Sequence, residues 1–210
     1  MKIVVFGATG GTGKNVVERA LAGGHEVVAV ARKPEAVAAR DRLVVHKGDV
    51  LDAASVVLAL AGADAVICAI GPSSNSKPGT LISEGLKNLV AGCTKTGVHR
   101  LVFESGIMVS DGSELSLLGR LAIKIFGGIF SKLRAEKVIA EASLTGSGLD
   151  WVIVRPPTLD HGPFTGTCVA APRARIVPAK AISHADCAAV LLKAATEPAW
   201  SKQVVNVGRV

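Results

Sequence analysis

Residues 3–13 of the chain read IVVFGATGGTG, an apolar run that ends in a loop of small residues. The apolar part predicts a β-strand, and residues 14–22 have the apolar spacing of a helix. Gly7, Gly10 and Gly13 therefore stand between a first strand and a first helix. A turn this tight needs residues without a Cβ, and it brings backbone N–H groups to the positive end of the helix. The GxxGxxG spacing in this context predicts a site for the diphosphate of a dinucleotide; glycines that merely turn the chain are the alternative.

The same alternation of short apolar runs and longer helical patterns continues along the chain. The strands are apolar at nearly every position, which is typical of strands that helices cover on both faces. We therefore predict an α/β fold in one domain, a doubly wound parallel sheet of the Rossmann type. The predicted strands are residues 3–6, 26–31, 43–46, 65–69, 101–103 and 151–154, and the predicted helices are residues 14–22, 34–39, 53–60 and 80–96.

The second half of the chain is less regular. Residues 112–128 are rich in Leu, Ile and Gly and predict a helix or a flap beside the ligand cleft. Residues 170–210 predict a short strand, a helix from about 184 to 195 and a last strand at 204–207. Because this segment has too little apolar sequence for a core of its own, we predict one domain over residues 1–210, with about 155–210 completing the substrate cleft.

Composition limits the partners of the protein. The formal net charge is +7, but the basic residues are scattered, which argues against nucleic acid and against a membrane surface, and aromatic residues, on which bases would stack, make up only 3%. No signal peptide opens the chain, and no apolar run reaches the roughly 20 residues that cross a bilayer. The four cysteines form no CxxC pair or zinc-like cluster. We expect a cytoplasmic monomer or small homo-oligomer that binds an anionic small molecule and no metal, nucleic acid or membrane.

The end of the second predicted strand indicates which dinucleotide binds. NAD sites place Asp or Glu there, about 20 residues beyond the glycines, to bind the ribose 2′-hydroxyl. This strand instead ends Val30-Ala31-Arg32-Lys33, with no acid. An arginine holds a 2′-phosphate by paired, charge-assisted hydrogen bonds. Arg32, with Lys33 as a second candidate, therefore predicts NADP(H) as the cofactor; a solvated basic loop is the alternative.

Two further strand ends carry candidate ligand contacts. Asp49 follows the third predicted strand and is either an acceptor for the adenine amino group or a simple turn residue. Residues 69–72, Ala-Ile-Gly-Pro, follow the fourth strand, at the carboxyl edge where ligands bind in such sheets.

Together these stretches resemble the atypical short-chain dehydrogenase/reductase proteins, in particular the biliverdin-IXβ reductase/flavin reductase group and its NmrA-like relatives. The resemblance covers nearly the whole chain. The RPP turn at residues 155–157, followed by GPFTG at 162–166, is more specific than the glycine loop. The resemblance implies that the cofactor contacts fall on Gly7, Thr9, Gly10, Gly11, Thr12, Arg32, Asp49, Val50, Gly71, Ser105, Pro156 and Pro157.

The departures from the family pattern concern the catalytic residues. Short-chain dehydrogenases use a YxxxK pair, but this chain has no Tyr, and the pair's place falls on Leu133 and Lys137. The acid is therefore missing, while Lys137 either holds the ribose or is an exposed helical lysine. Ser105 matches the family's active-site Ser and donates to the substrate or nicotinamide, or caps a turn. The flavin-reductase group has a His after the paired prolines; here Thr158 stands there, and His161 follows three residues on.

A mechanism without Tyr suits acceptors that take their proton from solvent. Flavins and quinones accept hydride at an electron-poor ring, so the protein need only orient donor and acceptor. We predict an NADPH-dependent oxidoreductase acting on a flavin, quinone or similar conjugated acceptor. Ser105 and Thr158 would orient the nicotinamide or the acceptor, and His161 would be a proton donor or a structural residue. The alternatives are a regulatory protein that senses NADP(H) without turnover and, less well supported, an enzyme of nucleotide-linked sugars.

Overall fold

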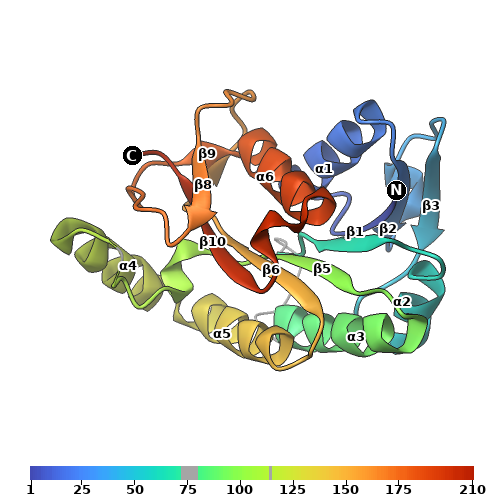
Figure 1. The fold of residues 1–210 in the computed structure, drawn as a ribbon, viewed down its shortest axis with the longest axis horizontal. Coiled ribbons are helices and arrows are strands. Elements are labelled where there is room, and N and C mark those ends of the chain that lie inside the picture. The colour runs from blue at the N-terminus through green and yellow to red at the C-terminus, as the bar shows by residue number, and fades with distance from the viewer. Residues whose placement is uncertain (72–79, 114) are drawn as a thin grey trace.

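Strands and helices alternate along most of the chain (Figure 1). The computed structural model describes residues 1–71, 80–113 and 115–210, so Pro72, which the sequence analysis placed at a strand end, lies outside the described residues. The strands are β1 (Lys2–Phe6), β2 (Glu26–Ala31), β3 (Leu43–Lys47), β4 (Ala65–Cys68), β5 (Arg100–Glu104), β6 (Asp150–Arg155), β7 (Leu159–Asp160), β8 (Val169–Pro172), β9 (Ile182–Ser183) and β10 (Gln203–Gly208). The helices are α1 (Gly11–Ala22), α2 (Ala53–Ala59), α3 (Leu81–Thr96), α4 (Leu117–Ile129), α5 (Ser131–Thr145) and α6 (His184–Thr196), with 3₁₀ turns η1 (Pro34–Ala36), η2 (Ile107–Val109) and η3 (Pro198–Trp200).

The central sheet has eight strands in the order β3-β2-β1-β4-β5-β6-β10-β8. All neighbouring strands are parallel except β10 and β8, which pair antiparallel at one edge. The predicted doubly wound Rossmann-type sheet is therefore confirmed, with one reversed strand that the sequence did not indicate. From β1 the order continues to β2 on one side and to β4 on the other, which opens a crevice at the carboxyl ends of these strands.

Helices cover both faces of the sheet: α1 and α6 lie on one side, and α2, α3 and α5 on the other (Figure 1). Strand β1 shows why the strands are apolar throughout. Ile3 and Val5 are buried in the core with residues of α1 and α6, while Val4 and Phe6 are buried in the core with residues of α2 and α3. Each side chain therefore faces a helical layer, whichever way it points.

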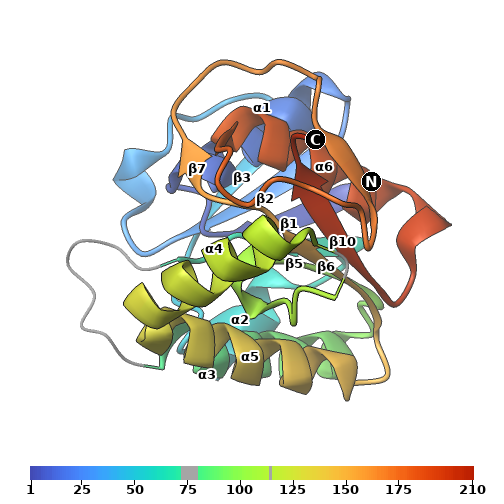
Figure 2. The ribbon, with the colours of Figure 1, turned by 90° about the vertical axis from the view of Figure 1, so that its left-hand side faces the viewer.

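The structure corrects the prediction in two places. Residues 34–39 form only the single turn η1, in which no residue is buried, so no apolar face supports a longer helix. Helix α5 was not predicted as an element, because its buried face consists of Ala140, Leu144 and the charged Glu141. Residues 112–128, expected to form a helix or a flap, contain most of α4, which lies in front of the sheet in Figure 2. Among the described residues, no helix is both long and apolar enough to span a membrane.

Candidate functional site

The glycine loop folds tightly against itself and against the end of β4. Gly7 has φ +83°, and a Cβ there would lie 2.3 Å from the carbonyl oxygen of Ala69. A Cβ on Gly13 would lie 2.0 Å from the carbonyl oxygen of Gly7, to which the Gly10 N–H donates a hydrogen bond of 2.9 Å. Backbone therefore occupies the space that side chains would need, which keeps the loop surface free for a ligand.

The first helix begins inside this loop. Helix α1 starts at Gly11, three residues earlier than predicted, with Gly10 as its N-cap. The cap supplies no side-chain hydrogen bond and the first turn holds no acid, so the N-terminal amides keep their capacity to bind an anion. The first residue of α6, His184, lies beside this turn, because a Cβ on Gly11 would come within 2.7 Å of its ring. Two helix N-termini thus meet at the loop.

A cleft of about 760 Å³ lies at this edge of the sheet. Its walls come from the glycine loop, from the carboxyl ends of β2, β4 and β5, and from the first residue of α6. The sequence-predicted residues that line it are Gly7, Thr9, Gly10, Gly11, Thr12, Arg32, Asp49, Val50, Gly71, Lys137 and His161. Lys33, the second candidate at the end of β2, is not among the lining residues.

The end of the cleft at β2 and β3 carries both basic and acidic residues, since Asp52 also lines the hollow that adjoins it. This hollow shares Arg32 and Asp49 with the cleft, and its other lining residues include His46 and Lys47. Asp49 makes the turn contact weighed as an alternative, since its Oδ1 accepts a 3.0 Å hydrogen bond from the Leu51 N–H. Its position in the cleft wall nevertheless leaves the residue next to any ligand.

Three polar side chains meet where α1, β5 and α6 come together. The Thr12 hydroxyl lies 3.1 Å from Glu104 Oε1, to which it donates, and 2.8 Å from His184 Nδ1. Burial raises the pKa of Glu104, while the charge on Lys137 acts in the opposite direction. Burial also lowers the pKa of His184, and the neighbouring His161 lowers it further. Both shifted groups are displaced towards their neutral forms.

Lys137 is half-buried on α5 and reaches the same part of the cleft. Its Nζ donates a 2.5 Å hydrogen bond to the carbonyl oxygen of Ser105, and burial lowers its pKa against the opposing charge of Glu104. The alternative of an exposed helical lysine is therefore wrong. Leu133, at the place of the family's tyrosine, packs against the hydrophobic core.

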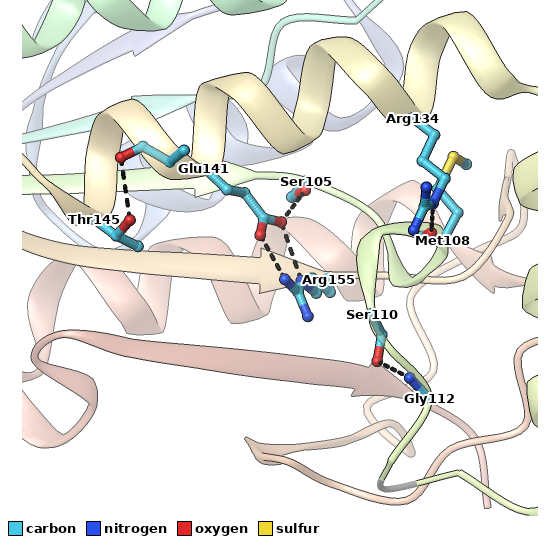
Figure 3. A network of polar contacts seen from close by, with 9 residues as sticks. Ser105, Met108, Ser110, Gly112, Arg134, Glu141, Thr145 and Arg155 are labelled. Atoms are coloured by element: carbon cyan, nitrogen blue, oxygen red, sulfur yellow. Dashed lines mark hydrogen bonds and ion pairs between the residues drawn. The ribbon is translucent and has the colours of Figure 1, made fainter.

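Ser105 differs from its predicted role. Its side chain is only 1% exposed, and its hydroxyl donates a 2.5 Å hydrogen bond to Glu141 Oε1. Arg155 holds the same carboxylate with both Nε and a terminal nitrogen, as Figure 3 shows. The expected hydrogen bond from Ser105 to a substrate or nicotinamide is thus replaced by one to a buried ion pair. What Ser105 presents towards the site is its carbonyl, which holds Lys137.

A smaller pocket of about 110 Å³ lies between the ends of β5 and β6 and helices α4 and α5. It shares Glu104 and Lys137 with the cleft, so the two spaces meet at these side chains. Most of its wall is apolar. The other sequence-predicted residues in its lining are Ser105, Pro156, Pro157 and Thr158, and its apolar lining also includes Ile107, Met108, Ile123, Phe130, Leu159 and Pro178.

His161 is exposed in the cleft wall, and its ring centroid lies 4.9 Å from that of His184. Sequence reasoning missed Glu104 and His184. Glu104 had a usable signal, since it directly follows an apolar strand at the carboxyl edge of the sheet. His184 had none, because it meets Thr12 across 172 positions of sequence.

Sequence comparison places the chain among known nucleotide-binding proteins. The model of a family described as NAD(P)H-binding matches residues 7–198. An uncharacterized chloroplastic protein of Arabidopsis thaliana is 35% identical over 183 residues, which cover 81% of this chain and 64% of that protein. The chain thus spans less than two thirds of the length of this relative.

Solved structures agree with the sequence comparison. The anaerobilin reductase ChuY of Escherichia coli O157:H7 superposes with a TM-score of 0.81 at 26% identity, covering 100% of this chain and 97% of that one. The oxidoreductase YlbE of Lactococcus lactis has a TM-score of 0.84 over 100% of this chain and 91% of that one, and at 21% identity it shows the shared fold. As the resemblance to atypical short-chain dehydrogenase/reductases predicted, the chain belongs to the NAD(P)H-binding protein family, and its cofactor is NAD(P)H.

Proposed function

We propose that the protein is an NADPH-dependent reductase that transfers hydride to a flat conjugated acceptor such as a flavin or a quinone. The observation that carries the proposal is the junction at Glu104 and Lys137, the two residues that line both the cleft and the smaller, mostly apolar pocket. One space suits a nucleotide and the other suits an apolar ring, and a hydride donor and acceptor must lie side by side. The similarity to the anaerobilin reductase ChuY supports a reductase.

The fit to a nucleotide rests on the glycine loop and on Arg32 at the end of β2. The loop leaves no room for a Cβ at Gly7 or Gly13, and the uncapped start of α1 suits a diphosphate. Arg32 lines both the cleft and the adjoining hollow that contains Lys47. Arg32 stands where NAD sites carry an acid, and a guanidinium there favours a 2′-phosphate over a free hydroxyl, which is why we propose NADPH over NADH.

Bound NADPH supplies the hydride, and the chain supplies position and protons. The Ser105 carbonyl fixes the Lys137 Nζ at the junction, where it can hold the ribose or the acceptor. Glu104 is the carboxyl group at this point, and its raised pKa keeps more of it protonated than an ordinary glutamate. We therefore propose Glu104 as the proton source that replaces the missing tyrosine. His161, which lines only the cleft end of this junction, is the second candidate.

Cofactor preference is tested by titrating the protein with NADPH and NADH and following nicotinamide fluorescence. The Arg32→Ala variant should lose roughly tenfold to a hundredfold in NADPH affinity, because a charge-assisted hydrogen bond contributes about 1.5–3 kcal/mol. NADH affinity should change little. The Lys33→Ala variant is the matched control, since it removes the adjacent positive charge from outside the cleft lining. Equal loss in both variants, or equal loss of both nucleotides, would refute the assignment.

Turnover is tested by NADPH oxidation with FMN or a soluble quinone as acceptor. We expect oxidation, and we expect the Glu104→Gln variant to slow the turnover rate more than it changes NADPH affinity, because a proton source acts after binding. Tight NADPH binding without oxidation by any acceptor would contradict the reductase and favour a protein that senses NADP(H). Unchanged turnover in Glu104→Gln would leave solvent or His161 as the proton source.

A further inference from the structure

Helix α4 presents an apolar face to solvent. Figure 1 shows the helix extending away from the sheet, and its inner side, with Ile123 buried, packs on the body of the protein. The opposite side consists of large aliphatic residues, of which Leu117 and Leu118 are 82% and 80% exposed. We call this surface the α4 face; its residues are Leu117, Leu118, Leu121, Ile125 and Ile129.

The spacing of these residues makes the face continuous. At about 3.6 residues per turn, all five fall within roughly a third of the helix circumference, directly opposite Gly119, Ile123 and Gly127. Those three inner residues are buried. A solvent-facing helix normally carries charged or polar residues at these outward positions, so the pattern of α4 is the reverse of the one expected for a helix facing water.

The charged residues of α4 and of the first turn of α5 are all basic. Lys124 lies on α4 beside the apolar residues, and Lys132 follows at the start of α5; both are exposed. The guanidinium groups of Arg120 and Arg134 instead donate hydrogen bonds to backbone carbonyls of residues 112–115 and of Met108. The sequence from residue 115 to 135 contains no Asp or Glu. An exposed apolar stripe with cations at its border is the pattern of a helix that lies in the interface of a bilayer with anionic headgroups.

A second copy of the chain fits this face less well. A two-fold contact between α4 faces would bring Arg120 and Lys124 of each copy close to the same residues of the other, without an acid to neutralise them. The helix is also short. Thirteen residues span about 20 Å, and one such face offers far less than the roughly 800 Å² per partner of a stable interface.

We propose that the α4 face docks the protein on the surface of an anionic lipid bilayer, with the aliphatic side chains in the headgroup boundary and the exposed Lys124 and Lys132 against the lipid charges. This departs from the expectation of no membrane partner, which rested on the scattered basic residues and on the lack of a membrane-crossing run. A helix that lies on a membrane needs no such run. The proposal does not depend on the proposed function, since docking requires neither NADPH nor an acceptor.

Docking would orient the apolar pocket towards the membrane. Ile123 on the inner side of α4, and Phe130 directly after the helix, both line that pocket. Helix α4 would therefore lie between the apolar pocket and the bilayer surface.

The test is co-sedimentation of the full chain with vesicles of phosphatidylcholine alone or mixed with phosphatidylglycerol, at low and high salt. We expect binding to the anionic vesicles that weakens at high salt. The Leu118→Gln/Ile125→Gln double variant should bind the anionic vesicles with an affinity reduced by roughly tenfold or more, because two aliphatic side chains no longer enter the interface. The Lys124→Glu variant should weaken binding to the anionic vesicles alone. These residues are exposed, so NADPH binding and thermal unfolding should match the wild type.

The matched control is Val44→Gln, which makes the same change at a residue that is 61% exposed on β3, at the opposite end of the molecule (Figure 1). It should leave vesicle binding unchanged. The proposal is overturned if the wild type binds neither kind of vesicle, or if the double variant binds as well as the wild type. It is also overturned if sedimentation velocity shows a dimer that the double variant converts to a monomer, since a second copy then covers the face.

Discussion

The ion pair between Glu141 and Arg155 is the buried interaction whose loss should affect the protein most. The two side chains are 9% and 16% exposed, and Glu141 also accepts the hydrogen bond of the Ser105 hydroxyl. The Glu141→Ala variant leaves both a guanidinium and a hydroxyl without their partner in a site that water hardly reaches. Breaking a buried pair from one side costs about 3–5 kcal/mol. For a chain of this size that corresponds to a fall in melting temperature of roughly 6–20 °C.

Urea and thermal unfolding of the full chain measure this loss, and two further variants show its origin. Glu136→Ala removes a glutamate of the same helix whose carboxylate accepts a 2.8 Å hydrogen bond from the Ile82 N–H and forms no ion pair among the described residues, so it should cost only about 0.5–2 kcal/mol. Arg155→Met combined with Glu141→Ala removes the orphaned charge, so the double variant should be more stable than Glu141→Ala alone.

Two results would refute this reasoning. One is a loss in Glu141→Ala no larger than the loss in Glu136→Ala. For the other, the Arg155→Met variant is also measured alone. If the loss of unfolding free energy in the double variant equals the sum of the losses in the two single variants, the two groups do not interact in the folded protein.

Three further predictions concern the loop, the apolar helix and the junction. Gly13→Ala should abolish NADPH binding or the fold, since its Cβ would meet the Gly7 carbonyl at 2.0 Å; a normal fluorescence titration would contradict this. Gly128→Ala on α4, whose Cβ would meet nothing within 4 Å, should raise the free energy of unfolding by about 0.5–1 kcal/mol in a urea titration. Because burial raises the pKa of Glu104 above 4.5, the stability present below pH 4.5 is lost as pH rises through the shifted value. The Glu104→Gln variant should therefore gain on the wild type over that range, and a difference in unfolding free energy that does not change with pH would show that Glu104 is not shifted.

The sheet was predictable because the apolar residues of each short strand segment are enough to indicate that the strand is buried. In β1, side chains of both orientations are apolar, so four consecutive residues already indicate a strand covered on two faces. The glycine loop was predictable for a similar reason: the requirement for missing side chains at Gly7 and Gly13 is local to the turn. The cleft lining followed, since strand ends of a parallel sheet meet at one edge.

The parts that could not be predicted depend on contacts between distant residues. Helix α5 buries Glu141, and a buried charge looks like a surface position until Arg155 and Ser105 are known to face it. The same contact redirects the Ser105 hydroxyl away from the site. His184 reaches Thr12 only because α6 packs beside α1, which no local pattern of sequence indicates.

The meeting of Thr12 with His184 has a consequence for biosynthesis. A ribosome releases the glycine loop early, but the residue that completes this corner of the cleft is made 172 positions later. At a synthesis rate of roughly 5–20 residues per second, His184 is added on the order of ten seconds or more after Thr12. During that interval the nascent chain has β1 and α1 without the helix that packs beside α1. Because His184 completes this corner of the cleft, we expect the binding free energy of NAD(P)H to add to stability only after synthesis has passed α6.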